Sequence, residues 1–186
     1  TWKVYGWDPV WNIWNRKYAI WGMLMAYRTT RDKAILDSVV RQVDQLFGML
    51  ARRGLRLRDT GTPSMNGLPS MSILKPLVML YEETGNRKYL DFAQKLADYA
   101  IGHPNMPADG IPHWDYGAPG EERDTSAASC MASALLELAT FLPDAEGARY
   151  RAFAVKQLLS LSSDEYFSKG DEIGHFLLKH GTGHKP

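Results

Sequence analysis

Apolar residues recur at helical spacing along most of the chain, whereas the alternation typical of a half-buried strand is scarce. This pattern predicts an all-α protein. The expected helices cover about 10–27, 31–52, 70–83, 87–101, 125–142 and 146–161. Longer connections are expected at roughly 55–69, 102–123 and 162–175.

Local signals mark several helix ends. Thr30 or Asp32 stands near the start of the second helix, and Asn86 stands just before the fourth, where a side-chain oxygen caps the first free backbone N–H groups. Pro76 falls inside the third segment and predicts a kink or a late start, because proline lacks a backbone donor.

Part of the pattern repeats. Residues 26–36 align with residues 80–90, and residues 89–93 align with residues 150–154. Each unit reads as a helix, a tight turn and a returning helix, and such hairpins stack because one hairpin cannot bury its own apolar side. When stacked hairpins curve into a ring, all the long loops lie on one face. The repeat therefore predicts stacked helical hairpins.

Composition narrows the class of protein. The 186 residues suffice for one domain with a real core, and we expect residues 1–186 to form it. A net charge of +1 provides no basic field for nucleic acid, and no apolar run is long enough to predict a membrane span. Cys130 is the single cysteine, which excludes an intrachain disulfide and a cysteine-based metal cluster; we expect it in the core.

Candidate chemistry gathers in the loop before the fifth helix. Two carboxylates, Asp115 and Asp124, stand among aromatic and basic residues. Sugar-cleaving sites combine a platform for the sugar ring with acids that move protons, so the loop favours an enzyme acting on carbohydrate. The accompanying side chains in this loop are His113, Trp114, Tyr116 and Arg123.

Each carboxylate also has a structural interpretation. Asp124 directly precedes a helix, where aspartate is a common N-cap, and capping and catalysis can coexist. Asp115 is either a site residue or a turn former that bonds nearby backbone. The aromatic rings of Trp114 and Tyr116 are either sugar platforms or packing residues under the loop.

The basic candidate residues also have two interpretations each. Arg123 would pair with a substrate carboxylate through its guanidinium fork, or with a neighbouring acid of the chain. His180 and His184 flank a Gly-Thr-Gly turn and would contact an anionic substrate or belong to a solvated tail. As a zinc pair they lack a suitable third ligand nearby, and no helix fixes them.

Residues 86–186 resemble the unsaturated glucuronyl hydrolases, glycoside hydrolase family 88. The matching segments are RKYL at 87–90, DGIPHWDY at 109–116, RDTSAAS at 123–129 and HFLLKHGTGH at 175–184. The resemblance implies a six-hairpin α/α toroid that removes a 4,5-unsaturated uronic acid from the non-reducing end of oligosaccharides. It also implies that Asp124 is the acid/base, and that no metal or organic cofactor takes part.

The first half resembles a different family of toroids, the β-L-arabinofuranosidases. The similar segments are VWNIWNRKY at 10–18 and the stretch from 70 to 93. The cysteine cluster that those enzymes use with zinc is absent from the chain. The His-Asp pair and the Trp-x-Arg-Gly-Gln segment of the glucuronyl hydrolases are absent as well.

These observations predict one toroid-like domain comprising about half a ring, as a fragment or a truncated chain. The expected substrate is an oligosaccharide containing uronic acid, with Asp124 and Asp115 as catalytic acids. A non-catalytic carbohydrate-binding half-toroid and an arabinofuranosidase-like enzyme are the alternatives. Half a ring would expose apolar hairpin sides, which suggests either association into a homo-oligomer or truncation of the chain. The resemblance leaves the compartment open between the bacterial periplasm and the cytoplasm.

Overall fold

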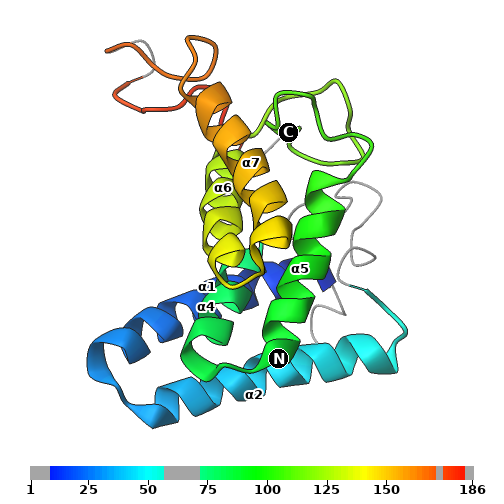
Figure 1. Cartoon of the computed structure of the whole chain (residues 1–186), viewed down its shortest axis with the longest axis vertical. Coiled ribbons are helices and arrows are strands. Elements are labelled where there is room, and N and C mark those ends of the chain that lie inside the picture. Colours follow the sequence, from blue (N-terminus) through cyan, green and yellow to red (C-terminus); the bar gives the residue numbers. More distant parts are fainter. Residues whose placement is uncertain (1–8, 57–71, 171–173, 183–186) are drawn as a thin grey trace. The chain divides into compact units, whose positions relative to one another are not determined.

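The computed structural model describes residues 9–56, 72–170 and 174–182, with side chains from residue 13 onward. These residues form helices and contain no strand, which confirms the predicted all-α class. Two isolated antiparallel bridges occur in the connections of the described part. The helices in Figure 1 are α1 (Pro9–Thr30), α2 (Lys33–Arg52), α4 (Leu74–Thr84), α5 (Arg87–Ile101), α6 (Thr125–Thr140) and α7 (Asp144–Leu161).

The predicted helix starts are confirmed. The side chain of Asp32 accepts a hydrogen bond from the N–H of Ala34 (2.9 Å) at the start of α2. Asn86 accepts one from the N–H of Lys88 (3.2 Å) at the start of α5. Helix α4 starts late, with Pro76 in its first turn, where the missing proline N–H costs no helical hydrogen bond. Ser70 and Met71 lie outside the described residues.

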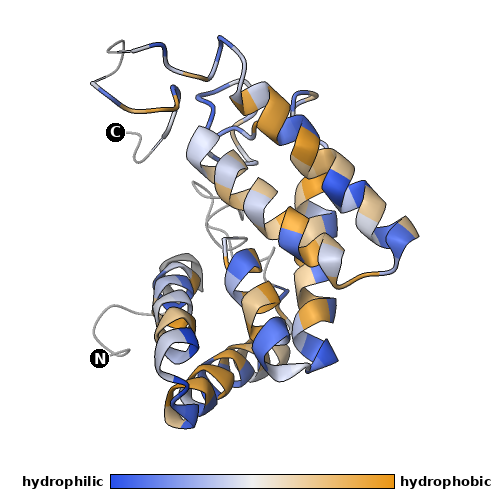
Figure 2. Cartoon of the chain, turned by 60° about the vertical axis from the view of Figure 1, so that its left-hand side comes forward, coloured by the Kyte–Doolittle hydropathy of each residue, from blue (hydrophilic) through white to orange (hydrophobic). Residues whose placement is uncertain are grey.

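The chain divides into two compact units, Thr1–Phe92 and Ala93–Pro186. In the first unit, α1 packs against α2 and α4, and hydrophobic and hydrophilic bands alternate along α2 (Figure 2). The buried side chains of α2 are Leu36, Val39, Val43, Leu46 and Leu50. The second unit is dominated by the packing of α6 against α7. The prediction of one domain over residues 1–186 stays a prediction.

The aligned segments of the hairpin repeat make similar side-chain contacts. In both units a basic residue and the tyrosine after it bind one aspartate of an earlier helix: Lys88 and Tyr89 of α5 bind Asp44 of α2, and Arg149 and Tyr150 of α7 bind Asp98 of α5. The two tyrosine hydroxyls donate at 3.0 Å and 2.6 Å, and both tyrosines are fully buried. The aligned segments therefore share a tertiary contact as well as a sequence pattern.

One prediction about the core is wrong. Cys130 is exposed, because the buried positions of α6 follow a helical period that turns residue 130 outward. The buried side of α6 consists of Ala128, Met131, Ala132, Leu135, Leu138 and Ala139, with Thr125 and Ala134 beside it.

The turn between α4 and α5 provides a test of the hairpin. Gly85 has φ +64°, in the left-handed region, and its N–H bonds the carbonyl of Tyr81 (2.7 Å). We expect Gly85→Ala to lower the free energy of unfolding by about 1 kcal/mol, since a Cβ strains this conformation. Gly85→Asn should lose less, because asparagine tolerates positive φ. Chemical denaturation measures both variants, and an unchanged Gly85→Ala midpoint would contradict the argument.

Candidate active site

The loop between α5 and α6 doubles back on itself. The N–H of Asp124 donates to the carbonyl of Pro112 (2.8 Å), and the N–H of Trp114 donates to the carbonyl of Glu122 (2.8 Å). Between these bonds, His113 and Arg123 form an antiparallel bridge. The two arms of the loop thus fix each other, and they deliver Asp124 to the first turn of α6.

Asp124 caps α6 with one of its two carboxylate oxygens. Its Oδ1 accepts hydrogen bonds from the N–H of Ser126 (3.0 Å), the N–H of Ala127 (3.2 Å) and the hydroxyl of Ser126 (2.6 Å). Within the described residues no hydrogen bond reaches Oδ2, and the residue is 9% exposed. The cap therefore orients the carboxylate while leaving its second oxygen available for proton transfer.

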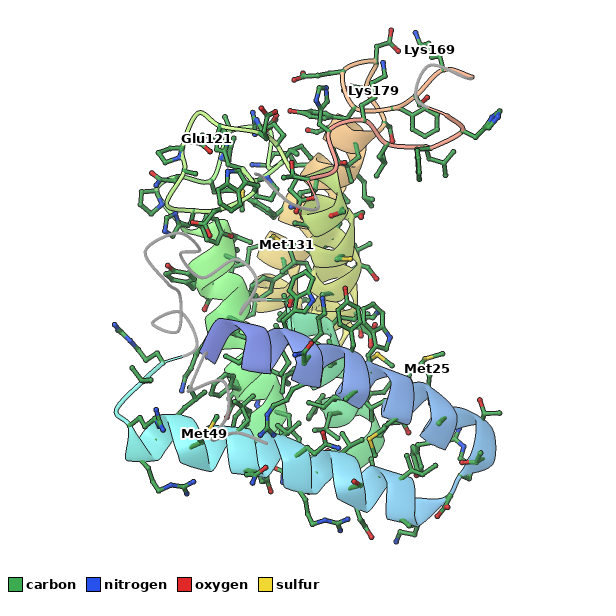
Figure 3. All side chains as sticks on the ribbon, turned by 180° about the vertical axis from the view of Figure 1, so that it is seen from behind. Met25, Met49, Glu121, Met131, Lys169 and Lys179 are labelled. Atoms are coloured by element: carbon green, nitrogen blue, oxygen red, sulfur yellow. The ribbon has the colours of Figure 1, made fainter. Side chains whose placement is uncertain are left out.

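A segment near the C-terminus lies against the start of α6. The backbone N–H of Thr125 donates to the carbonyl of His180 (3.2 Å), and its hydroxyl donates to the carbonyl of Lys179 (2.7 Å). The hydroxyl of Thr182 donates to the carbonyl of Arg123 (2.9 Å). Figure 3 labels Lys179 on this segment and Glu121 on the doubled-back loop. Both neighbours of Asp124 in the sequence are thus held by the same segment.

Of the two candidate histidines near the C-terminus, the structure describes His180. The backbone of His180 adjoins the start of α6, and its exposed ring meets the ring of Tyr166 edge-on, with centroids 5.9 Å apart. Its role in contacting a substrate anion stays a prediction. His184 lies outside the described residues.

Asp115 is buried in a turn. Its side chain accepts a hydrogen bond from the N–H of Gly117 (2.6 Å), its carbonyl accepts one from Ala118 (3.1 Å), and it is 2% exposed. These are the contacts of a turn-forming aspartate, the alternative left open by the sequence. A catalytic role for Asp115 stays a prediction.

Tyr116 belongs to a buried aromatic cluster. Its ring stacks on His103 with centroids 4.2 Å apart, meets Tyr99 edge-on at 6.1 Å, and is 1% exposed. Burial raises the pKa of the Tyr116 hydroxyl, which donates to the carbonyl of Ala100 (3.3 Å). Burial also lowers the pKa of His103, and nearby Asp115 opposes that shift. The observed contacts of Tyr116 are those of a packing residue.

Trp114 and His113 are oriented by Glu121. The indole N–H of Trp114 donates to the Glu121 carboxylate (2.9 Å), and Nδ1 of His113 lies 2.6 Å from the Glu121 carbonyl oxygen. The N–H of Gly120 donates to Nε2 of His113 (3.2 Å), so the Nδ1–H tautomer satisfies both contacts. Trp114 is half-buried, and its use as a sugar platform stays a prediction.

Arg123 pairs with Asp109, an acid that the sequence did not single out. Nη1 and Nη2 of Arg123 lie 3.2 Å and 3.1 Å from the two carboxylate oxygens of Asp109, and Nη1 also donates to the carbonyl of Ile111. The hydroxyl of Tyr166 donates to Asp109 (2.8 Å), as does the N–H of Ile111 (3.0 Å). The role of Arg123 as a contact for a substrate carboxylate stays a prediction.

These contacts shift the pKa of the Asp109 carboxyl group. Burial alone would raise its pKa, but the hydrogen bonds from Ile111 and Tyr166 and the positive charge of Arg123 together lower it below the usual value. The sequence did not indicate Asp109 and Tyr166 as partners, because 57 positions separate them along the chain and only folding brings them into contact. The Asp-Gly turn at 109–110 was the available signal.

The donors of a zinc–thiolate site are not assembled here. In the part of the chain with described coordinates, no group of three or more His, Cys, Asp or Glu side chains is arranged to hold a metal ion. The single cysteine, Cys130, is exposed on α6. The residues therefore do not fit the zinc cluster of the arabinofuranosidases.

Stacked helical hairpins are the architecture of the α/α-toroid glycoside hydrolases, and this chain has a fold of that class. More particularly, the chain belongs to the family of the β-L-arabinofuranosidase GH127 catalytic domain, whose model matches residues 3–148. This match confirms the resemblance seen in the first half, and it extends through α6.

The resemblance to unsaturated glucuronyl hydrolases is also confirmed. The chain is 39% identical over 111 residues to the enzyme of Formosa agariphila, covering 58% of this chain and 27% of that protein. It is 30% identical over 104 residues to the enzyme of Bacillus sp. strain GL1, covering 54% of this chain and 27% of that protein. The chain thus spans about a quarter of the length of these curated relatives.

Solved structures share the fold. A crystal structure of an unsaturated glucuronyl hydrolase specific for heparin matches with a TM-score of 0.74 and 28% identity, covering 94% of this chain and 51% of that one. A Streptococcus agalactiae enzyme complexed with dGlcA-GalNAc6S matches with a TM-score of 0.69 and 18% identity, covering 90% and 50%. This chain therefore corresponds to about half of a toroid. Among its described helices, none has the length and apolar character needed to cross a membrane.

Proposed function

We propose that this chain provides the Asp124 side of a glycosidase site that releases a terminal 4,5-unsaturated uronic acid from an oligosaccharide. The observation that carries the proposal is the one-sided bonding of Asp124: three hydrogen bonds hold Oδ1, and none among the described residues holds Oδ2. The similarity to unsaturated glucuronyl hydrolases supports this choice of substrate.

The reaction follows from the chemistry of the unsaturated ring. Asp124 in its acid form would give a proton to C4 of the C4=C5 enol ether, and the positive charge that develops at C5 is shared with the ring oxygen. The resulting carboxylate would then take a proton from the water that attacks C5. The product is a hemiketal that opens and releases the rest of the oligosaccharide. One water is consumed, and Asp124 regains its proton.

The direct experiment incubates the chain with lyase-generated oligosaccharides and follows the ultraviolet absorbance of the C4=C5 bond. We expect the absorbance to fall with time as the double bond is hydrated. A constant absorbance together with a change in tryptophan fluorescence would contradict hydrolysis by this chain and favour the non-catalytic binding alternative. Light scattering on the same sample tests the proposed homo-oligomer.

The family match favours a second candidate, an arabinofuranosidase-like activity. Such an enzyme would release a pentose from a β-L-arabinofuranoside and would leave the unsaturated chromophore intact. Sugar analysis after incubation with that substrate separates the two candidates.

A further inference from the structure

The Arg123 pair joins Asp109 to the acid proposed for catalysis. Arg123 directly precedes Asp124, and its guanidinium is held by both carboxylate oxygens of Asp109 and by the carbonyl of Ile111. Its own carbonyl accepts the hydroxyl of Thr182 (2.9 Å). Arg123 is therefore anchored at its guanidinium and at its carbonyl, which restrains the backbone next to Asp124.

Asp109 is itself fixed from α7 and from the segment after it. The hydroxyl of Ser160 donates to the backbone carbonyl of Asp109 (2.8 Å), and the amide of the fully buried Gln157 donates to the carbonyl of Gly110 (2.8 Å). Tyr166, 1% exposed, donates its hydroxyl to the Asp109 carboxylate (2.8 Å). The backbone at 109–110 is therefore held by α7, and the Asp109 carboxylate is held by Tyr166.

We propose that Asp109, Arg123 and Tyr166 form a positioning network that holds Asp124 in its reactive orientation, an inference that rests on the proposed function. The guanidinium fork is already occupied by Asp109 and a backbone carbonyl, so Arg123 acts through the backbone of its neighbour. A small displacement of a catalytic group lowers the rate of the chemical step more than it weakens binding. The network therefore supports kcat and leaves KM nearly unchanged.

The chain contains a matched control for the test. Tyr150 is also fully buried, and its hydroxyl donates to an aspartate, Asp98, that pairs with an arginine, Arg149. No hydrogen bond or ion pair found in the described residues connects this second cluster to Asp124 or its two neighbours. Tyr150→Phe thus removes the same chemical group from the same kind of partner.

The kinetic test compares Tyr166→Phe with Tyr150→Phe. We expect Tyr166→Phe to lower kcat about tenfold with KM within about twofold, and Tyr150→Phe to leave both within about twofold. Asp109→Asn should lower kcat further, because it also removes the partner of the guanidinium. Equal losses in both tyrosine variants would overturn the proposal. A rise in KM alone for Asp109→Asn would instead indicate that Arg123 binds the substrate carboxylate.

A second measurement does not depend on turnover. Hydrogen exchange of the backbone amides of Ser126 and Ala127, which bond Asp124, reports the order of the cap. We expect about tenfold faster exchange in Tyr166→Phe and unchanged exchange in Tyr150→Phe. Unchanged exchange in both variants would overturn the positioning network, whatever the activity. Altered exchange in a chain without turnover would reject the proposed function alone.

Discussion

Asp124→Asn is expected to lower turnover of the unsaturated oligosaccharide by about 10³-fold or more, because an amide does not supply the transferred proton. The fold should survive. The amide oxygen of asparagine can still accept the hydrogen bonds from Ser126 and Ala127, and asparagine caps helices about as well as aspartate. Only the favourable charge at the helix start is lost, which costs about 0.3–1 kcal/mol. Steady-state kinetics and chemical denaturation measure the two effects separately.

Asp32→Asn is the matched control for this variant. Asp32 caps α2 through the same kind of contact, a side-chain oxygen that accepts the N–H of Ala34. We expect a similar small loss of stability and unchanged turnover. If Asp124→Asn keeps turnover within about tenfold of the parent chain, Asp124 is a cap and not the acid/base.

Gly147→Ala is expected to lower the free energy of unfolding by about 1–3 kcal/mol through overpacking. A Cβ at position 147 would lie 2.6 Å from the carbonyl oxygen of Ala139, and the carbonyl carbon would lie at 3.5 Å. Both are backbone atoms of α6, so the clash is relieved only by shifting α6 against α7. Because α6 carries Asp124 at its start, we expect turnover to fall as well. Denaturation and kinetics on the same preparation measure both effects.

The control variant, Gly48→Ala, is expected to change the free energy of unfolding in the opposite direction. Gly48 also lies inside a helix, but its nearest neighbour is the terminal nitrogen of the flexible Arg52 side chain, 3.3 Å from a built Cβ. Gly48→Ala should therefore stabilise by about 0.5–1 kcal/mol through helix propensity. Stabilisation by both variants would show that α6 and α7 adapt to the added methyl group, contrary to our expectation.

Much of the fold could be predicted because helices depend on local signals. Asp32, Asn86 and Asp124 mark helix starts through their own side chains, and the apolar period identifies the buried sides. The same local logic failed at Cys130, where residue type suggested burial and the helical phase decided otherwise. Phase is set by neighbouring apolar positions, so it outweighs the preference of a single small residue.

The candidate site was less predictable, since its contacts join distant residues. Arg123 was expected to meet a substrate or a neighbouring acid, but folding pairs it with Asp109, whose carboxylate also accepts the hydroxyl of Tyr166. The turn contacts of Asp115 and the buried ring of Tyr116 likewise depend on how the loop packs. Spacing along the chain contains no information on which of several nearby acids a guanidinium reaches.

The sequence by itself determined the helices and the position of the Asp124 carboxylate at the start of α6, because these depend on residues a few positions apart. It also contained the hairpin repeat, as a pattern that recurs along the chain. The tertiary structure alone decided that one oxygen of Asp124 is held while the other accepts no hydrogen bond among the described residues. It also decided that Arg123 is held by Asp109, whose carboxylate in turn accepts the hydroxyl of Tyr166. Those features need groups from separate segments to meet at hydrogen-bond distance, and only packing brings them together.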